Sequence, residues 1–248
     1  MLEILYRDDW LIAIHKPAGL LVHRSELDRR ETRFAVQLLR DQIGRRVQPV
    51  HRLDRGTSGV LLFAFEGDIA AALGHQFESQ AVDKRYLAIV RGWPAEAGRI
   101  DHPLRVVRDP YERAADDEVP AQAALTRFRR LASVELPIAV DRYPASRYAL
   151  LALAPESGRR HQLRRHLKHI SHPIIGDATY GKGAHNRMFG EHFGSERLLL
   201  ANLGLRFTHP VSGEVVSVTA PPAEDFRRVV AALGWSDVNC VPDFIWGD

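Results

Sequence analysis

The chain has 248 residues, of which 45% are hydrophobic and 26% charged, and its formal net charge is +3 at neutral pH. This composition is typical of a globular protein and excludes a disordered one. No run approaches the roughly 18 uninterrupted apolar residues of a membrane helix, and Glu3 argues against a signal peptide. The single cysteine, Cys240, excludes an internal disulfide and a thiolate metal cluster, so we expect a cytoplasmic protein.

The first half of the sequence predicts a mixture of short strands and helices separated by turn residues. Thr32 is the expected N-cap of the first helix, and Gly44 is expected to end it. The predicted strands span 2–6, 10–14, 60–65 and 84–90, the first two as a hairpin, and the predicted helices span 32–44 and 68–80.

The second half contains two polar stretches between further elements. Residues 101–119 contain Pro103 and Pro110, so we expect a long loop there, and residues 136–147 resemble an insertion between two strand-like segments. Ser157 is the expected N-cap of the next helix. The predicted elements are strands over 148–153, 198–208 and 214–219 and helices over 157–170 and 225–233.

Strands and helices follow one another without regular alternation, which is typical of an α+β fold rather than a doubly wound parallel sheet. No internal repeat, low-complexity tract or linker divides the sequence. We therefore expect a single domain over residues 1–248.

The most informative segment is HRLDRGTSG, at 51–59. Asp54 lies between Arg52 and Arg55, and nearby positive charge favours an ionised carboxylate. The two glycines permit backbone angles that other residues avoid, and they let a polymer come close to the main chain. The segment predicts an ionised aspartate on a fixed loop, although the same residue types also form ordinary turns.

A second motif lies on the predicted helix after Ser157. Helical spacing places Leu163 and Leu167 on one apolar stripe, with Arg164 at its border. A cation at the edge of a core needs an anionic partner, because burying it unpaired is costly, and a planar guanidinium suits a carboxylate. We therefore expect Arg164 to pair with Asp54.

Cationic residues gather between positions 159 and 168, where no acidic residue occurs. A basic strip on a nearly neutral protein is typical of a polyphosphate partner, although a solvated helix face has the same pattern. The strip consists of Arg159, Arg160, Arg164, Arg165 and Lys168, with His161 and His166 between them.

Taken in order, these segments resemble the RluA family of RNA pseudouridine synthases. HRLDRGTSG matches the family's catalytic-aspartate motif, KRYLAIVRG from Lys84 matches its tyrosine motif, and GRRHQLRRHL from Gly158 matches its arginine motif. The opening LYRDDWLIAIHKPAGLLVH and the later HPIIGDATYG also resemble family segments. The resemblance implies a central mixed, largely antiparallel sheet flanked by helices and loops, without a separate S4 RNA-binding domain.

The resemblance also implies a role for each site residue. Asp54 would be the essential catalytic acid, and Tyr86 would stack on the target uracil and handle the C5 proton. Arg164 would pair with Asp54, Leu163 would pack beneath the base, and Arg52 would fill the gap left by the extruded nucleotide. Taken singly, all of these except Asp54 are better explained as core residues, a structural ion pair or a surface cation.

The reaction implied is the isomerisation of uridine to pseudouridine, which needs no cofactor and no metal. The opening segment, RYPASRYAL and EHFGSERLLL are most similar to family members that modify uridine 65 of tRNA. The expected partner is therefore tRNA, with no DNA or membrane partner, and the expected state is a monomer.

The residues leave other functional classes open. The sequence has 12 histidines, and histidine is a common metal ligand, but their spacing matches no HExxH-type pattern. A glycoside hydrolase also breaks a bond at an anomeric carbon but usually needs two carboxylates, and the 51–59 segment offers one. A non-catalytic RNA-binding module would tolerate loss of Asp54 and Arg164. The same chemistry on another tRNA or rRNA uridine is the remaining alternative.

Overall fold

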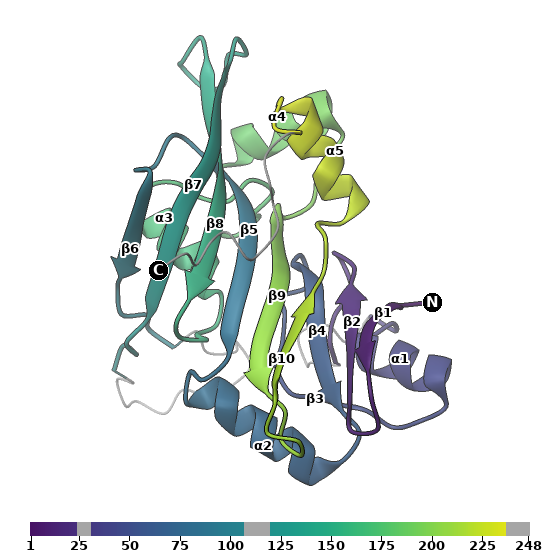
Figure 1. Cartoon of the computed structure of the whole chain (residues 1–248). Helices are drawn as coiled ribbons and strands as arrows, with labels where there is room; N and C mark the ends of the chain where they lie inside the picture. Colours follow the sequence, from purple (N-terminus) through teal and green to yellow (C-terminus); the bar gives the residue numbers. More distant parts are fainter. Residues whose placement is uncertain (24–30, 107–119, 237–248) are drawn as a thin grey trace.

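The computed structural model describes residues 1–23, 31–106 and 120–236, and the strands within them form one sheet (Figure 1). The strands are β1 (Glu3–Arg7), β2 (Leu11–Lys16), β3 (Gln48–Pro49), β4 (Ser58–Ala64), β5 (Asp83–Arg91), β6 (Ala97–Asp101), β7 (Leu125–Leu136), β8 (Ser146–Pro155), β9 (Leu200–Thr208) and β10 (Val215–Thr219). The helices are α1 (Ala35–Ile43), α2 (Gly67–Glu78), α3 (Gln162–His169), α4 (Gly183–Phe193) and α5 (Glu224–Ala232).

Across the sheet the strands follow the order β1-β2-β4-β9-β5-β8-β7-β6, while β10 pairs with β9 and β3 with β4. Paired strands are antiparallel, except that β4 and β9 are parallel where Ser58 lies opposite Ala201 and Gly59 opposite Asn202. The predicted α+β fold with a mixed, largely antiparallel sheet is confirmed.

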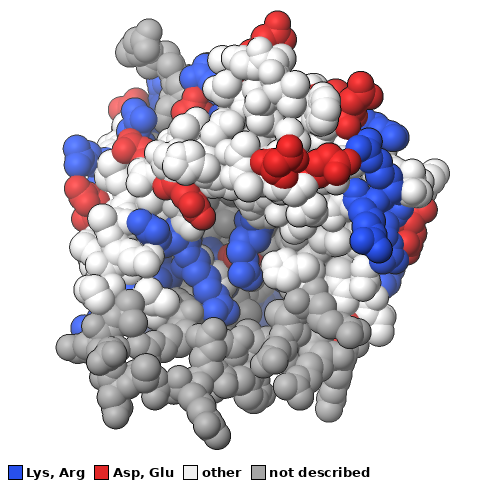
Figure 2. Space-filling view, turned by 90° about the horizontal axis from the view of Figure 1, so that it is seen from below, with Lys and Arg blue, Asp and Glu red and all other residues white. Residues whose placement is uncertain are grey.

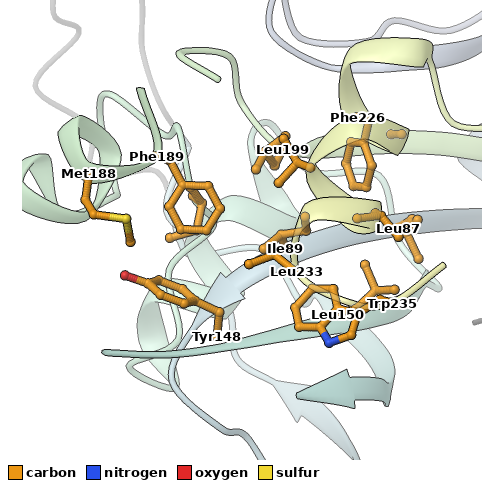
Figure 3. Close-up of a cluster of buried hydrophobic side chains, with 14 of the residues drawn as sticks. Leu87, Ile89, Tyr148, Leu150, Met188, Phe189, Leu199, Phe226, Leu233 and Trp235 are labelled. Carbon is orange, nitrogen blue, oxygen red and sulfur yellow. The ribbon is translucent and has the colours of Figure 1, made fainter. Parts of the chain in front are cut away.

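Helices cover both faces of the sheet, with α4 and α5 on one face and α3 on the other (Figure 1). In β5, Leu87 and Ile89 join the core beneath α4 and α5, whereas Ala88 and Val90 join the core beneath α3. Successive strand residues point to opposite faces, so a strand that is covered on both sides is apolar throughout. Figure 3 shows the first of these cores, where Phe226 of α5 packs with β5.

The central strand β4 is also buried on both sides. Val60 and Leu62 belong to the core that includes α2, and Leu61 and Phe63 belong to the core that includes α1. Tyr86 contacts both the α1 core and the α3 core. Its ring therefore lies on the face of the sheet that these two helices cover.

Most predicted elements are confirmed to within a few residues. The N-terminal hairpin forms between β1 and β2, and Gly44 ends α1 in a left-handed conformation with φ of 66°. The predicted elements at 60–65, 68–80, 84–90, 148–153, 198–208, 214–219 and 225–233 correspond to β4, α2, β5, β8, β9, β10 and α5.

Two predicted helix starts are wrong. α1 begins at Ala35, three residues after Thr32, and no side chain caps it. α3 begins at Gln162 rather than directly after Ser157. The Oε1 of Gln162 instead accepts hydrogen bonds from Ser157 Oγ at 2.7 Å and from the backbone N–H of Arg159 at 3.0 Å, which hold the preceding residues in a turn.

No pattern in the sequence predicts β3, β6 or α4, whereas β7 corresponds to the strand-like segment expected before the insertion at 136. Residues 136–147 include the tip of the β7–β8 hairpin, where Val140 and Tyr143 form a bridge. Of the long loop expected at 101–119, residues 107–119 lie outside the described part of the chain. Among the described helices, none combines the length and apolar character that crossing a lipid bilayer requires.

We expect Gly59→Ala to disrupt the parallel pairing of β4 and β9. Gly59 has a φ of 113°, and a Cβ there would lie 1.9 Å from the carbonyl oxygen of Asn202. The free energy of unfolding should fall by more than about 3 kcal/mol in urea denaturation. The matched control is Gly44→Ala. Gly44 has a φ of 66° and no atom within 4 Å of an added Cβ, so this variant should lose only about 1 kcal/mol of unfolding free energy. Equal losses in the two variants would contradict this account.

Candidate active site

The segment 51–57 leads into β4 where this strand meets β9, so it lies over the middle of the sheet. The backbone N–H of Thr57 donates to the carbonyl of Asp54 at 3.0 Å and closes a turn. The Nε2 of His51 accepts a hydrogen bond from the backbone N–H of Leu62 at 3.1 Å. Burial lowers the pKa of His51 to about 3, so its ring stays neutral and anchors the start of the loop to β4.

Lys16 at the end of β2 holds the other side of this loop. Its side chain is fully buried, and Nζ donates to three backbone carbonyls, at 2.7 to 3.2 Å, including that of Arg55. The backbone N–H of Gly19 donates to the same Arg55 carbonyl at 2.8 Å. Burial and the charge of Arg197 lower the pKa of Lys16 to about 7, against the opposing effect of Asp54. The residue after Asp54 is thus fixed from two directions.

Arg164 of α3 links two carboxylates. Its Nη1 donates to Oδ2 of Asp54 at 3.1 Å, which is the contact expected from the sequence. The same guanidinium donates to Asp177 through Nε at 2.7 Å and through Nη2 at 2.9 Å. The side chain of Arg164 is 11% exposed, and that of Asp177 is fully buried. Asp177 is therefore the closer and more buried partner.

The pKa shifts in this cluster follow from the same contacts. Burial would raise the pKa of Asp177, but hydrogen bonds from Arg164 and from the backbone N–H groups of Tyr180 and Thr179 lower it overall. Burial would lower the pKa of Arg164, but the two carboxylates raise it overall. Arg164 and Asp177 therefore form a charged pair.

Asp54 lies on the wall of a cavity of about 580 Å³, which is also lined by Tyr86 and Leu163. This volume falls within the roughly 300–1,000 Å³ range of small-molecule pockets. Burial, with a contribution from the charge of Asp54, raises the pKa of Tyr86, so its hydroxyl keeps its proton. A second hollow of about 510 Å³ shares Asp54, Arg52 and Arg164 with the first. Asp54 is thus reachable from two sides.

Cationic side chains surround the site. The view of the molecule from below shows a hollow bordered by Lys and Arg side chains (Figure 2). Arg52 is exposed, which places a cation at the mouth of the cavity. The cations that line the two hollows are Arg52, Arg55, Lys84, Arg159, Arg160, Arg164 and Arg197. This charge suits a polymer of phosphates.

All five residues singled out in the sequence line the cavity, namely Asp54, Tyr86, Arg164, Leu163 and Arg52. They come from the loop before β4, from β5 and from α3.

Sequence reasoning missed Asp177 and Lys16. An aspartate after a glycine and a lysine at a strand end are both typical of the surface, so neither type signals burial. The one available signal for Asp177 is its place in HPIIGDATYG, a segment that resembles the family.

The sequence matches the family described as RNA pseudouridylate synthase over residues 10–169. The chain belongs to this family, and the resemblance seen in the sequence is confirmed. The family's enzyme class, an isomerase that forms pseudouridine in RNA, is the class expected from the sequence.

Similar proteins include two that carry the name tRNA pseudouridine synthase C. The protein of Vibrio cholerae serotype O1 is 48% identical over 96% of this chain and 98% of its own length. That of Pasteurella multocida is 49% identical over 97% of this chain and 99% of its own length.

Two solved human structures have a similar fold. Human RNA Pseudouridylate Synthase Domain Containing 4 gives a TM-score of 0.69 with 26% identity, over 94% of this chain and 93% of that one. Human RNA Pseudouridylate Synthase Domain Containing 1 gives a TM-score of 0.68 with 24% identity, over 94% of this chain and 95% of that one.

We expect Asp177→Asn to lower the free energy of unfolding by about 3 kcal/mol near neutral pH, because it leaves Arg164 with a single anionic partner. Since the folded state lowers the pKa of Asp177, its contribution is present above the unfolded pKa and is lost as the pH falls through the folded pKa. The difference between wild type and variant should therefore shrink in urea denaturation as the pH falls below about 5, through the unfolded and then the lower folded pKa of Asp177.

The control for this prediction is Asp101→Asn. Asp101 pairs with Arg99 at 3.0 Å, but both side chains are more than 60% exposed, at 62% and 67%. Exposed pairs contribute at most about 1 kcal/mol. A difference for Asp177→Asn that stays constant with pH would contradict the role of its charge.

Proposed function

We propose that this chain converts a uridine of tRNA to pseudouridine, at position 65, with Asp54 as the catalytic carboxylate. The observation that carries the proposal is the Asp54–Arg164 pair at the wall of a cavity that Tyr86 and Leu163 also line. The tRNA substrate is supported by the relatives named tRNA pseudouridine synthase C, at 48% and 49% identity over nearly the whole chain.

The reaction breaks the N1–C1′ bond, turns the uracil and joins C5 to C1′, while C5 loses a proton and N1 gains one. An ionised Asp54 suits each of three routes: attack on C1′, addition to C6 of the uracil, or removal of a ribose proton. In all three, the charged guanidinium of Arg164 stabilises the carboxylate and fixes its position through a charge-assisted hydrogen bond.

A uridine inside an RNA stem has to leave the stack to reach Asp54. Extruding a base costs a few kcal/mol, and stacking on an aromatic ring returns roughly 1–3 kcal/mol. In this proposal Tyr86 of β5 supplies the ring, and its position on the cavity wall, which Leu163 of α3 also lines, supports that role. In this proposal Arg52 occupies the gap in the stem and neighbouring cations hold the phosphates, which is supported by the exposure of Arg52 at the cavity.

We expect Asp54→Asn to abolish pseudouridine formation, with a loss of at least about 10²–10⁴-fold, because the amide can neither attack carbon nor accept a proton as the carboxylate does. The affinity for tRNA should stay within a few-fold of the wild type, since the side chain keeps its size. Release of tritium from uridine labelled at C5 measures turnover, and filter binding measures affinity. Unchanged turnover would contradict the assignment of Asp54.

We expect Tyr86→Phe to fold normally but lose about 10²-fold in turnover, because the hydroxyl can accept the C5 proton while passing its own proton on towards N1, and a phenyl ring cannot. The same tritium-release assay measures this loss, and thermal denaturation checks the fold. Tyr86→Leu is the matched variant, since it also removes the stacking ring. Wild-type turnover in Tyr86→Phe combined with a loss in Tyr86→Leu would reduce Tyr86 to a stacking role.

The tRNA target is tested by mapping pseudouridines in total RNA from a strain that lacks the gene, against the wild type. Loss of pseudouridine at position 65 of tRNA, restored by wild-type protein but not by Asp54→Asn, is the expected result. Loss of pseudouridine at another tRNA or rRNA position instead would agree with the enzyme class but contradict the proposed substrate.

A further inference from the structure

One titratable side chain outside the machinery described above reaches Asp54. The Nε2 of His161 lies 3.7 Å from Oδ1 of Asp54, while Arg164 holds Oδ2. The side chains of His161 and Asp54 are 20% and 22% exposed, and both line the cavity. The two carboxylate oxygens therefore face two different nitrogen groups.

Tyr180 fixes the other end of the His161 ring. Its hydroxyl lies 3.1 Å from Nδ1 of His161, and the two rings meet edge to face. Tyr180 is itself held, because its backbone N–H donates to Oδ1 of Asp177 at 2.9 Å and its ring lies against the guanidinium of Arg164. The imidazole is thus connected at both nitrogens to the ion-pair cluster.

The backbone at His161 is also unusual. This residue adopts φ of 56° and ψ of 27°, the left-handed region that side chains other than glycine rarely enter, directly before α3. Gln162 maintains this turn, since its side chain bonds to Leu125 and Thr126 of β7. Because these bonds hold the turn, they fix the direction in which the His161 side chain leaves the backbone.

The charges around the imidazole favour one tautomer. Burial, the largest effect, lowers the pKa of His161. The carboxylates of Asp54 and Asp177 raise this pKa, and the cations Arg164 and Arg160 lower it. The net result is a pKa below the ordinary value of histidine. The ring is therefore neutral near neutral pH and carries one N–H. Because the anionic carboxylate faces Nε2, the proton is favoured on Nε2, and Nδ1 accepts the hydroxyl proton of Tyr180.

We propose that His161 is a positioning residue of the active site, which directs Nε2–H to Oδ1 of Asp54 while Arg164 holds Oδ2 and Tyr180 fixes the tautomer. The role rests on the proposed function of Asp54. Contacts of this kind are often long without substrate and tighten when substrate excludes water, so 3.7 Å is short enough for a bond in the complex. Two donors on opposite oxygens prevent the carboxylate from rotating.

Two substitutions of His161 distinguish loss of its contact with Asp54 from damage to the fold. In His161→Gln the amide nitrogen takes the place of Nε2, whereas in His161→Asn it reaches only as far as Nδ1. Asparagine tolerates the left-handed region, and Gln80 adopts it in this chain with φ of 63°. Tyr180→Phe keeps the ring against Arg164 and removes only the hydroxyl that holds Nδ1.

In steady-state assays kcat should fall about tenfold to a hundredfold in His161→Asn and stay within about threefold of wild type in His161→Gln, with KM little changed in both. The loss of turnover in Tyr180→Phe should be smaller than in His161→Asn. Tyr180→Phe removes the hydroxyl that selects the His161 tautomer, but it leaves Nε2 in place. Wild-type turnover in His161→Asn, or equal losses in the Asn and Gln variants, would overturn the proposal.

NMR of the imidazole nitrogens tests the same contact without RNA, so it stands even if the substrate assignment fails. The expected result is the Nε2–H tautomer in the wild type, with a His161 pKa that falls further in Asp54→Asn because the carboxylate charge is removed. The Nδ1–H tautomer, or a His161 pKa that Asp54→Asn leaves unchanged, would overturn the proposal.

Discussion

Arg164 brings a permanent charge to the edge of the interior, where an unpaired guanidinium would be strongly unfavourable. Two hydrogen bonds to the buried carboxylate of Asp177 and one to Asp54 compensate this charge. The three residues come from α3, from the segment after Ile174 and from the loop before β4. Because the charge has to be neutralised, these three segments are fixed relative to one another, and the carboxylate of Asp54 is fixed with them.

The parallel contact between β4 and β9 determines where that carboxylate lies. Gly59 of β4 lies opposite Asn202 of β9, and Asn202 lies opposite Tyr86 of β5. Neighbouring strands are about 4.8 Å apart, so one intervening strand separates Gly59 from Tyr86 by about 10 Å. At this separation Asp54, in the loop that precedes β4, and Tyr86 line the same cavity, although they belong to different elements.

The continuous apolar runs of β4 and β5 could be predicted because strands covered on both faces need no polar residues. The bounds of β7 could not be predicted, because one of its faces is largely exposed and a register shift between Arg130 and Ala132 breaks the alternation of apolar and polar residues. The start of α3 could not either, since Gln162 bonds to Leu125 and Thr126, which lie 37 and 36 residues away. Local capping rules cannot anticipate bonds to a strand so distant in the chain.

The sequence by itself determined the α+β class and the family, and it singled out Asp54, Tyr86, Leu163 and Arg164 as candidate site residues, because these depend on periodicity and on motifs contained in short segments. Only the tertiary structure decided that Asp177 is the main partner of Arg164 and that Lys16 is buried beneath the Asp54 loop. It also placed the His161 ring between Asp54 and Tyr180. The reason is physical: burial, hydrogen-bond partners and pKa shifts arise from the packing of distant segments.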